Sequence, residues 1–102
     1  MAVVTVATMT IKPDRMEDYL DNARKSKAIM EKHGAKNVRL LAAVVAGEAT
    51  GTLAFISEAD GPAAQGAFTK QYMADPERPR TLNTSASPIA SAQITMWVDI
   101  PL

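Results

Sequence analysis

The residues best suited to chemistry lie on one face of the last apolar segment of the chain, residues 92–100. Alternate positions of this segment carry Gln93, Thr95, Trp97 and Asp99 on one face and Ile94, Met96, Val98 and Ile100 on the other. Such alternation is typical of a half-buried β-strand. The mixed face holds the only tryptophan. One flat ring with a few polar groups suits a small-ligand cavity, whereas tryptophan is also enriched at subunit interfaces. Both interpretations of Trp97 stay open.

Two further side chains are candidates for the same ligand. Arg39 stands among apolar residues of a second strand, where its guanidinium could hold a carboxylate or an enolate oxygen. Alternatively, it pairs with an acid such as Asp99 and faces water. Tyr72 either packs a helix onto the sheet or points its hydroxyl into a cleft. The ligand-binding candidates are therefore Arg39, Tyr72, Gln93, Thr95 and Trp97, and the sequence assigns no catalytic residue.

The only histidine, His33, is a secondary candidate as a general base or ligand. It stands beside Gly34 at the expected end of a helix, where a partly cationic ring suits the helix dipole. A histidine without an evident carboxylate partner is weak evidence for catalysis. A haem-binding role would require an axial ligand inside a cavity, and a helix end is a poor place for one.

Composition excludes several classes of protein. The 102 residues suit one domain spanning 1–102. Eleven basic and eleven acidic residues cancel, which removes the electrostatic drive for nucleic-acid binding. The absence of cysteine excludes disulfides and thiolate chemistry, and one histidine makes no metal site. We expect no cofactor and no metal.

The chain shows no signature of membrane insertion or export. No apolar run approaches the length needed to span a bilayer. The apolar start lacks a basic region, so we interpret it as a strand rather than a signal peptide. We expect a cytoplasmic protein.

The hydrophobic pattern predicts four strands and two helices. Pro13 suits the first position of one helix, Gly34 its end, and Asp60 the N-cap of the second helix. The strands are expected over 3–11, 38–46, 52–57 and 92–100, with a hairpin turn at 47–51 and a long crossover over 75–87. The expected core residues are Met16, Tyr19, Leu20, Ala23 and Met30 of the first helix and Ala64, Ala67, Phe68 and Tyr72 of the second.

The order β-α-β-β-α-β predicts a ferredoxin-like α+β fold, in which a four-stranded antiparallel sheet carries both helices on one face. Strands 38–46 and 52–57 are apolar on both faces. Such strands are usually covered on both sides, and a bare apolar face would exceed what monomers tolerate. We therefore expect a homodimer in which two sheets pack face to face.

Length, element order and two short segments carry a family resemblance. Lys12-Pro13-Asp14 precedes the first helix, and Asp75-Pro76-Glu77 follows the second. Over nearly its whole length the chain resembles small members of the dimeric α/β-barrel superfamily, which includes antibiotic-biosynthesis-type monooxygenases, stress-responsive barrel proteins and NIPSNAP-like proteins.

The resemblance leaves the activity open. It implies a small apolar or aromatic ligand inside the barrel and, as candidate chemistry, cofactor-independent oxidation or isomerisation. The alternative is a non-enzymatic, stress-related or partner-binding dimer whose interior is filled. Whether the protein is an enzyme stays open.

Overall fold

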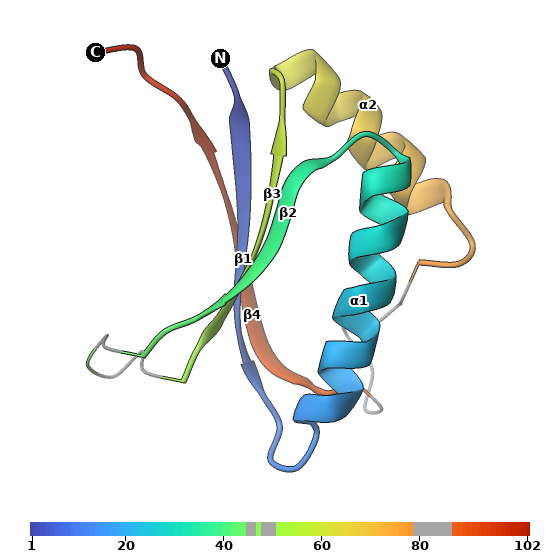
Figure 1. Ribbon diagram of the computed structural model, residues 1–102, viewed down its shortest axis with the longest axis vertical. Coiled ribbons are helices and arrows are strands. Elements are labelled where there is room, and N and C mark those ends of the chain that lie inside the picture. The colour runs from blue at the N-terminus through green and yellow to red at the C-terminus, as the bar shows by residue number, and fades with distance from the viewer. Residues whose placement is uncertain (45–46, 48–50, 79–86) are drawn as a thin grey trace.

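The computed structural model describes residues 1–44, 47, 51–78 and 87–102. The chain forms β1 (Val3–Ile11), α1 (Met16–Lys32), β2 (Lys36–Ala42), β3 (Leu53–Ala59), α2 (Pro62–Ala74) and β4 (Ile89–Val98). The four strands make one sheet in the order β2-β3-β1-β4, with every pair antiparallel. Both helices lie on the same side of this sheet (Figure 1). The predicted ferredoxin-like α+β fold is confirmed.

The register of the strands separates two faces of the sheet. Thr5 lies opposite Ser57 of β3 and Met96 of β4, and these side chains point toward the helices; we call this side the helix face. One residue further along β1, Val6 lies opposite Ile56 and Thr95, and alternation turns this set to the other side. We call that side the outer face, and it carries Val4, Val6, Thr8, Arg39, Leu41, Ala54, Ile56, Glu58, Gln93, Thr95 and Trp97.

Two apolar clusters join the helices to the helix face. One contains Met9, Tyr19, Ala23 and Leu53, and the other contains Ala35, Val38 and Phe68. Phe55 packs against both clusters. Along α1, Tyr19 and Ala23 are buried as expected, but Met16 is 40% exposed. Its predicted place in the core is wrong.

The first helix begins later than predicted. Asp14 has a φ of 62°, which L-residues in a right-handed helix cannot adopt, and Arg15 occupies the N-cap. Pro13 therefore stands outside α1. The local chain turn at Asp14 overrides the preference of proline for a first helical turn.

The second helix also differs in detail from the prediction. Its N-cap is Gly61, because the Asp60 carboxylate is bound to the Lys36 ammonium at 2.8 and 2.9 Å. The buried residues of α2 are Gln65 and Phe68. Ala64 and Ala67, predicted to be buried, are exposed.

The strand boundaries shift by a few residues. β2 starts at Lys36, ahead of the predicted residue 38, and its register with β3 changes between Lys36 and Arg39. β3 continues to Ala59 and β4 starts at Ile89. Residues 45–46, 48–50 and 79–86, which the predicted second strand, turn and crossover include, lie outside the described residues. No helix in the described ranges is long and apolar enough to cross a membrane.

Candidate functional site

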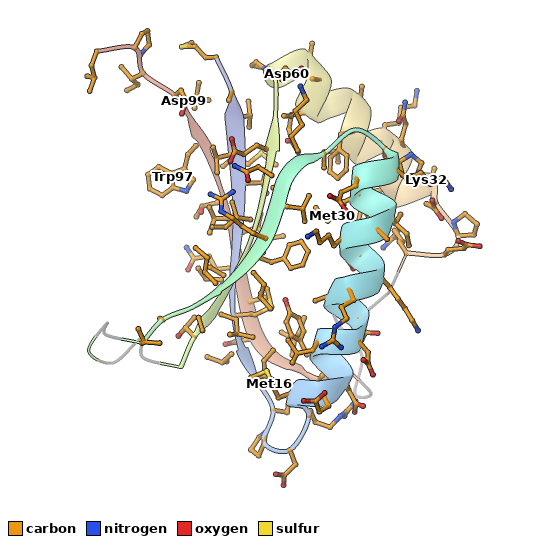
Figure 2. The ribbon with its side chains drawn as sticks, viewed as in Figure 1. Met16, Met30, Lys32, Asp60, Trp97 and Asp99 are labelled. Carbon is orange, nitrogen blue, oxygen red and sulfur yellow. The ribbon has the colours of Figure 1, made fainter. Side chains whose placement is uncertain are left out.

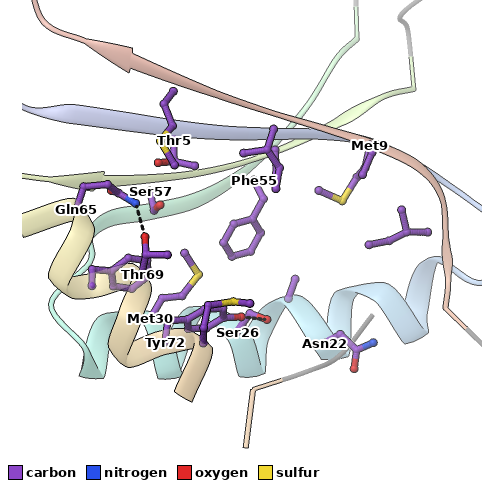
Figure 3. Close-up of a pocket in the computed structure, with 18 of the residues that line it drawn as sticks. Thr5, Met9, Asn22, Ser26, Met30, Phe55, Ser57, Gln65, Thr69 and Tyr72 are labelled. Atoms are coloured by element: carbon purple, nitrogen blue, oxygen red, sulfur yellow. Dashed lines mark hydrogen bonds between the residues drawn. The ribbon is translucent and has the colours of Figure 1, made fainter. Parts of the chain in front are cut away.

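A cavity of about 290 Å³ lies between the helix face and the two helices (Figure 3). Its floor comes from β1, β3 and β4, and its walls come from α1 and α2. Small side chains, such as Ala7 on β1 and Ala23 on α1, are among the residues that line it. Ile94 and Met96 on β4 are 57% and 58% exposed, so the cavity is open along this strand.

Aromatic rings and methionines make the apolar part of the lining. The rings of Phe68 and Tyr72 stack on α2 with centroids 5.7 Å apart and an angle of 19° between their planes. Phe55 rises from β3 at the centre of the cavity (Figure 3). Methionine is unbranched and polarizable, so it adapts its shape to a ring and makes favourable sulfur–aromatic contacts. Four methionines line the cavity: Met9, Met30, Met73 and Met96.

Polar side chains gather at one end of the cavity. Thr5 and Ser57 lie side by side on β1 and β3, and Gln65 and Thr69 face them from α2 (Figure 3). The Gln65 amide Nε2 donates a hydrogen bond to the Thr69 hydroxyl at 3.2 Å. The Thr5 hydroxyl oxygen is buried and has no hydrogen-bond partner in the described part of the chain.

Two tyrosines add hydroxyl groups elsewhere in the lining. The Tyr72 hydroxyl donates to the Ser26 hydroxyl at 3.4 Å. Burial raises the pKa of Tyr19 to about 12, because desolvation penalises the phenolate, so its hydroxyl stays protonated at neutral pH. No Asp, Glu, His, Lys or Arg side chain is among the described residues that line the cavity. The described part of the lining therefore offers hydrogen bonds and apolar surface without a charged side chain.

The predicted ligand-binding residues are split between the two faces of the sheet. Tyr72 lines the cavity, whereas Arg39, Gln93, Thr95 and Trp97 all lie on the outer face. Trp97 projects from β4 on the side away from the helices (Figure 2), is 62% exposed, and donates from its indole nitrogen to the Thr95 hydroxyl at 2.9 Å. Thr95, two residues earlier on the same face of β4, accepts this bond, so these two candidates are in contact.

Arg39 is not in contact with the other outer-face candidates. Its guanidinium donates to a Glu58 carboxylate oxygen at 3.0 Å and to the Asn37 carbonyl at 2.8 Å. An acid does pair with Arg39, but it is Glu58 rather than Asp99. Arg39 and Thr95 share one row at the opposite edges of the sheet, which separates their backbones by roughly 14 Å at the usual strand spacing.

His33 lies outside the cavity, at the point where the ends of α1 and α2 meet. Its ring nitrogen Nε2 lies 2.8 Å from a carboxylate oxygen of Asp75, whose side chain is only 4% exposed. The same carboxylate accepts the backbone N–H of Glu77 at 2.9 Å and lies 3.5 Å from the Lys32 ammonium. The hydrogen bond from His33 lowers the pKa of Asp75, and the bond from Glu77 acts in the same direction. This pair ties two helix ends together and does not contribute to the cavity.

Two hydroxyl residues at inward positions of apolar strands could have pointed to the polar end of the cavity. Thr5 stands between Val3 and Ala7 on the inward side of β1, and Ser57 stands between Phe55 and Ala59 on the inward side of β3. A hydroxyl at an inward position of an apolar strand is costly unless it is bonded. Such positions therefore mark either an internal hydrogen bond or a ligand contact.

No group of three or more His, Cys, Asp or Glu side chains in the described ranges is arranged to hold a metal ion. No protein-family model matches the chain, and no curated protein matches it in sequence. The similarity of this chain to known proteins is therefore one of fold.

Several solved structures share the fold over almost the full chain. A NIPSNAP domain protein from Burkholderia xenovorans superposes with a TM-score of 0.73 at 16% identity, covering 96% of this chain and 94% of its own. A NIPSNAP family protein from Agrobacterium tumefaciens gives 0.75 at 12% identity, covering 98% and 94%. A protein described as an antibiotic biosynthesis monooxygenase gives 0.68 at 17% identity, covering 97% and 99%. These similarities show a shared ferredoxin-like fold, and they confirm the predicted resemblance at that level.

Proposed function

We propose that the protein binds a small, uncharged, largely aromatic molecule in the cavity between its sheet and its helices. The observation that carries this proposal is the lining itself, which combines stacked rings and methionines with a few hydroxyl and amide groups and no charged side chain among its described members. Ligand sites commonly have this composition. The proposed site lies on the opposite side of the sheet from Trp97, not between two sheets as the sequence suggested.

The size of the cavity limits the ligand. An apolar cavity of about 150 Å³ accepts one benzene molecule. The 290 Å³ found here therefore suits a molecule of about two fused rings. A larger planar macrocycle such as haem would also bring carboxylates, for which the described lining has no cationic partner.

Binding fits the lining better than catalysis does. One of the similar structures is described as a monooxygenase, and oxidation of an aromatic substrate without a cofactor would begin by removing a proton from it. A general base must stand within hydrogen-bond reach of that proton. Neither an acid nor a histidine is among the described lining residues, and the raised pKa of Tyr19 keeps its hydroxyl protonated, so it cannot take up a proton at neutral pH. We therefore infer a binding role.

Calorimetric titration with 2-naphthol tests this proposal. We expect saturable binding with one site per chain and no oxygen consumption in an oxygen-electrode assay. Ala7→Phe fills the cavity floor and should abolish binding, while Ala64→Phe, on the exposed side of α2, should leave it intact. Absence of binding by the wild-type protein, or unchanged binding by Ala7→Phe, would contradict the proposal.

We also propose that the outer face packs against a second copy of the chain. Its apolar side chains include Leu41 and Trp97, which are 48% and 62% exposed in the single chain. Large apolar side chains exposed on one face of a sheet favour an interaction site there, and a net charge of zero gives little repulsion between copies. Size-exclusion chromatography with light scattering should give twice the mass of the 10.9 kDa chain; a monomer at micromolar concentration would overturn this proposal.

A dimer of this kind is compatible with the ligand site. The second copy would cover Trp97, whereas the cavity lies beneath the helices. The interior between two sheets can therefore be filled while the ligand site stays accessible along β4.

A further inference from the structure

We infer that Thr5 anchors the bound ligand through a hydrogen bond and that the ligand carries a neutral oxygen, a hydroxyl or a carbonyl, at the Thr5 end of an otherwise apolar ring system. This inference rests on the proposed function, since it assigns a chemical class and an orientation to the molecule in the same cavity.

The Thr5 hydroxyl is the observation that requires an explanation. Its oxygen is buried and no described residue satisfies it. A buried hydroxyl without a partner destabilises a fold, so a protein that keeps one commonly uses it for another purpose. A hydroxyl both donates and accepts, and it can therefore bind either a phenolic O–H or a carbonyl oxygen.

The neighbours of Thr5 do not supply the missing hydrogen bond. Across the sheet it faces Ser57 on one side and Met96 on the other. On the helix above, one N–H of the Gln65 amide donates to Thr69, and Gln65 makes no hydrogen bond to Thr5. All of these residues line the same cavity, so the Thr5 side chain stands in the wall of the space that a ligand would occupy, with its hydroxyl oxygen buried and unbonded.

The lining is also asymmetric, and this sets the orientation of the ligand. On the sheet floor, the hydroxyl groups of Thr5 and Ser57 lie at one end and Met9, Ile89 and Ala92 at the other, while Tyr19 and Asn22 of α1 add polar groups to the wall near Met9. A two-ring molecule would accordingly place its oxygen toward Thr5 and its hydrocarbon end toward Met9 (Figure 3). A carboxylate or phosphate would lose its hydration without gaining an opposite charge from the described lining residues, so we assign the oxygen to a neutral group.

A pair of isosteric probes separates the hydrogen bond from the rest of the binding. The probes are 2-naphthol and 2-methylnaphthalene, which differ by a hydroxyl against a methyl group. Both are titrated by calorimetry into the wild-type protein, Thr5→Val, Thr5→Ser and Thr8→Val. Valine keeps the shape of threonine without its hydroxyl, serine keeps the hydroxyl, and Thr8 stands on the outer face of the same strand as a matched control.

We expect Thr5→Val to weaken 2-naphthol binding by roughly tenfold, the equivalent of one lost hydrogen bond, and to leave 2-methylnaphthalene binding within about twofold. Thr5→Ser should keep the preference for 2-naphthol, and Thr8→Val should bind both probes like the wild-type protein.

Two results would overturn the inference, and they are distinguishable. If Thr5→Val changes the binding of both probes equally, or of neither, the cavity binds ligands but Thr5 is not the anchor. If the wild-type protein binds neither probe, the proposed function fails and this inference fails with it.

Discussion

At the scale of single residues, Thr5 is the clearest case of a side chain that adds little to folding and is available for binding. Its buried hydroxyl has no partner in the described structure, so it contributes little to the stability of the folded chain. A group retained at a cost to the fold is the kind of feature that binding sites keep and that stabilising substitutions remove.

Replacing this hydroxyl should stabilise the protein while it weakens ligand binding. We expect Thr5→Val to raise the free energy of unfolding by about 1 kcal/mol, because it removes an unsatisfied buried polar group and keeps the side-chain shape. Urea denaturation measures the change. Thr8→Val on the outer face is the control and should change stability by less. A destabilised Thr5→Val protein would show that the hydroxyl is satisfied within the fold.

The Asp75 carboxylate, unlike the Thr5 hydroxyl, stabilises the folded state through its hydrogen bonds. It is bound by His33 and by the backbone of Glu77, and its pKa is lowered in the folded protein, first by the His33 bond. Stabilisation by such a group is present above its unfolded pKa, about 4, and is lost as the pH falls through the lower folded pKa.

We therefore expect the free energy of unfolding of the wild-type protein to decrease as the pH is lowered below about 4. Asp75→Asn should be less stable at pH 7 and should lose less stability on acidification. Urea denaturation at pH 7, 4 and 3 measures both effects. Asp60→Asn removes an exposed carboxylate that pairs with Lys36 and should keep the wild-type pH dependence; an identical profile for Asp75→Asn would contradict the prediction.

Among the secondary-structure elements, α1 ends as the sequence predicts. Gly34 has a φ of +96°, its N–H donates to the Glu31 carbonyl, and the Ala35 N–H donates to the Met30 carbonyl. This pair of bonds is the Schellman motif, which requires a left-handed residue after the helix. The end of α1 is fixed by a single residue type, whereas its start depends on the turn at Asp14.

Two glycine substitutions should therefore have opposite effects. Gly34→Ala places a side chain in a left-handed conformation and should lower the free energy of unfolding by about 1 kcal/mol. Gly66 stands within α2 with open space around its position, so Gly66→Ala should raise it by roughly 0.5–1 kcal/mol. Chemical denaturation of both variants measures the difference. If both variants changed the free energy of unfolding by the same amount, the end of α1 would contribute little to stability.

At the scale of the whole molecule, the two faces of the sheet differ in what covers them. The helix face is covered in part by α1 and α2, while the outer face has no covering element in the described chain (Figure 1). An added charge on that face should therefore change the association state without changing the fold.

We expect Leu41→Glu to convert a dimer into a monomer at micromolar concentration, because a second copy would have to bury the new carboxylate. Light scattering measures the mass, and circular dichroism checks the fold. Met16→Glu adds the same charge to an exposed apolar position at the start of α1 and should leave the mass unchanged. A Leu41→Glu protein that remains dimeric would place the interface elsewhere.

Local pattern determined the elements of this protein and their order. Alternating apolar residues define β1, whose bounds were predicted correctly at Val3–Ile11, and Gly34 defines the end of α1. These signals are readable because strand alternation and left-handed turns depend on neighbouring residues. Local pattern did not predict where the two helices start. Asp14 adopts a left-handed conformation ahead of α1, and the Asp60 side chain ahead of α2 binds Lys36 of β2.

The site was decided by the tertiary structure. Alternation placed Gln93, Thr95 and Trp97 on one face of the last strand, since it fixes the side of a strand on which each residue lies, but it could not relate Arg39 of another strand to them. It could not show that Trp97 points away from the helices, that Tyr72 lies across the sheet from it, or that Thr5, Ser57 and Gln65 meet at one end of a cavity. Those relations depend on which strands pair and in which register. Residues more than fifty positions apart in the sequence, such as Thr5 and Ser57, meet only when the chain folds.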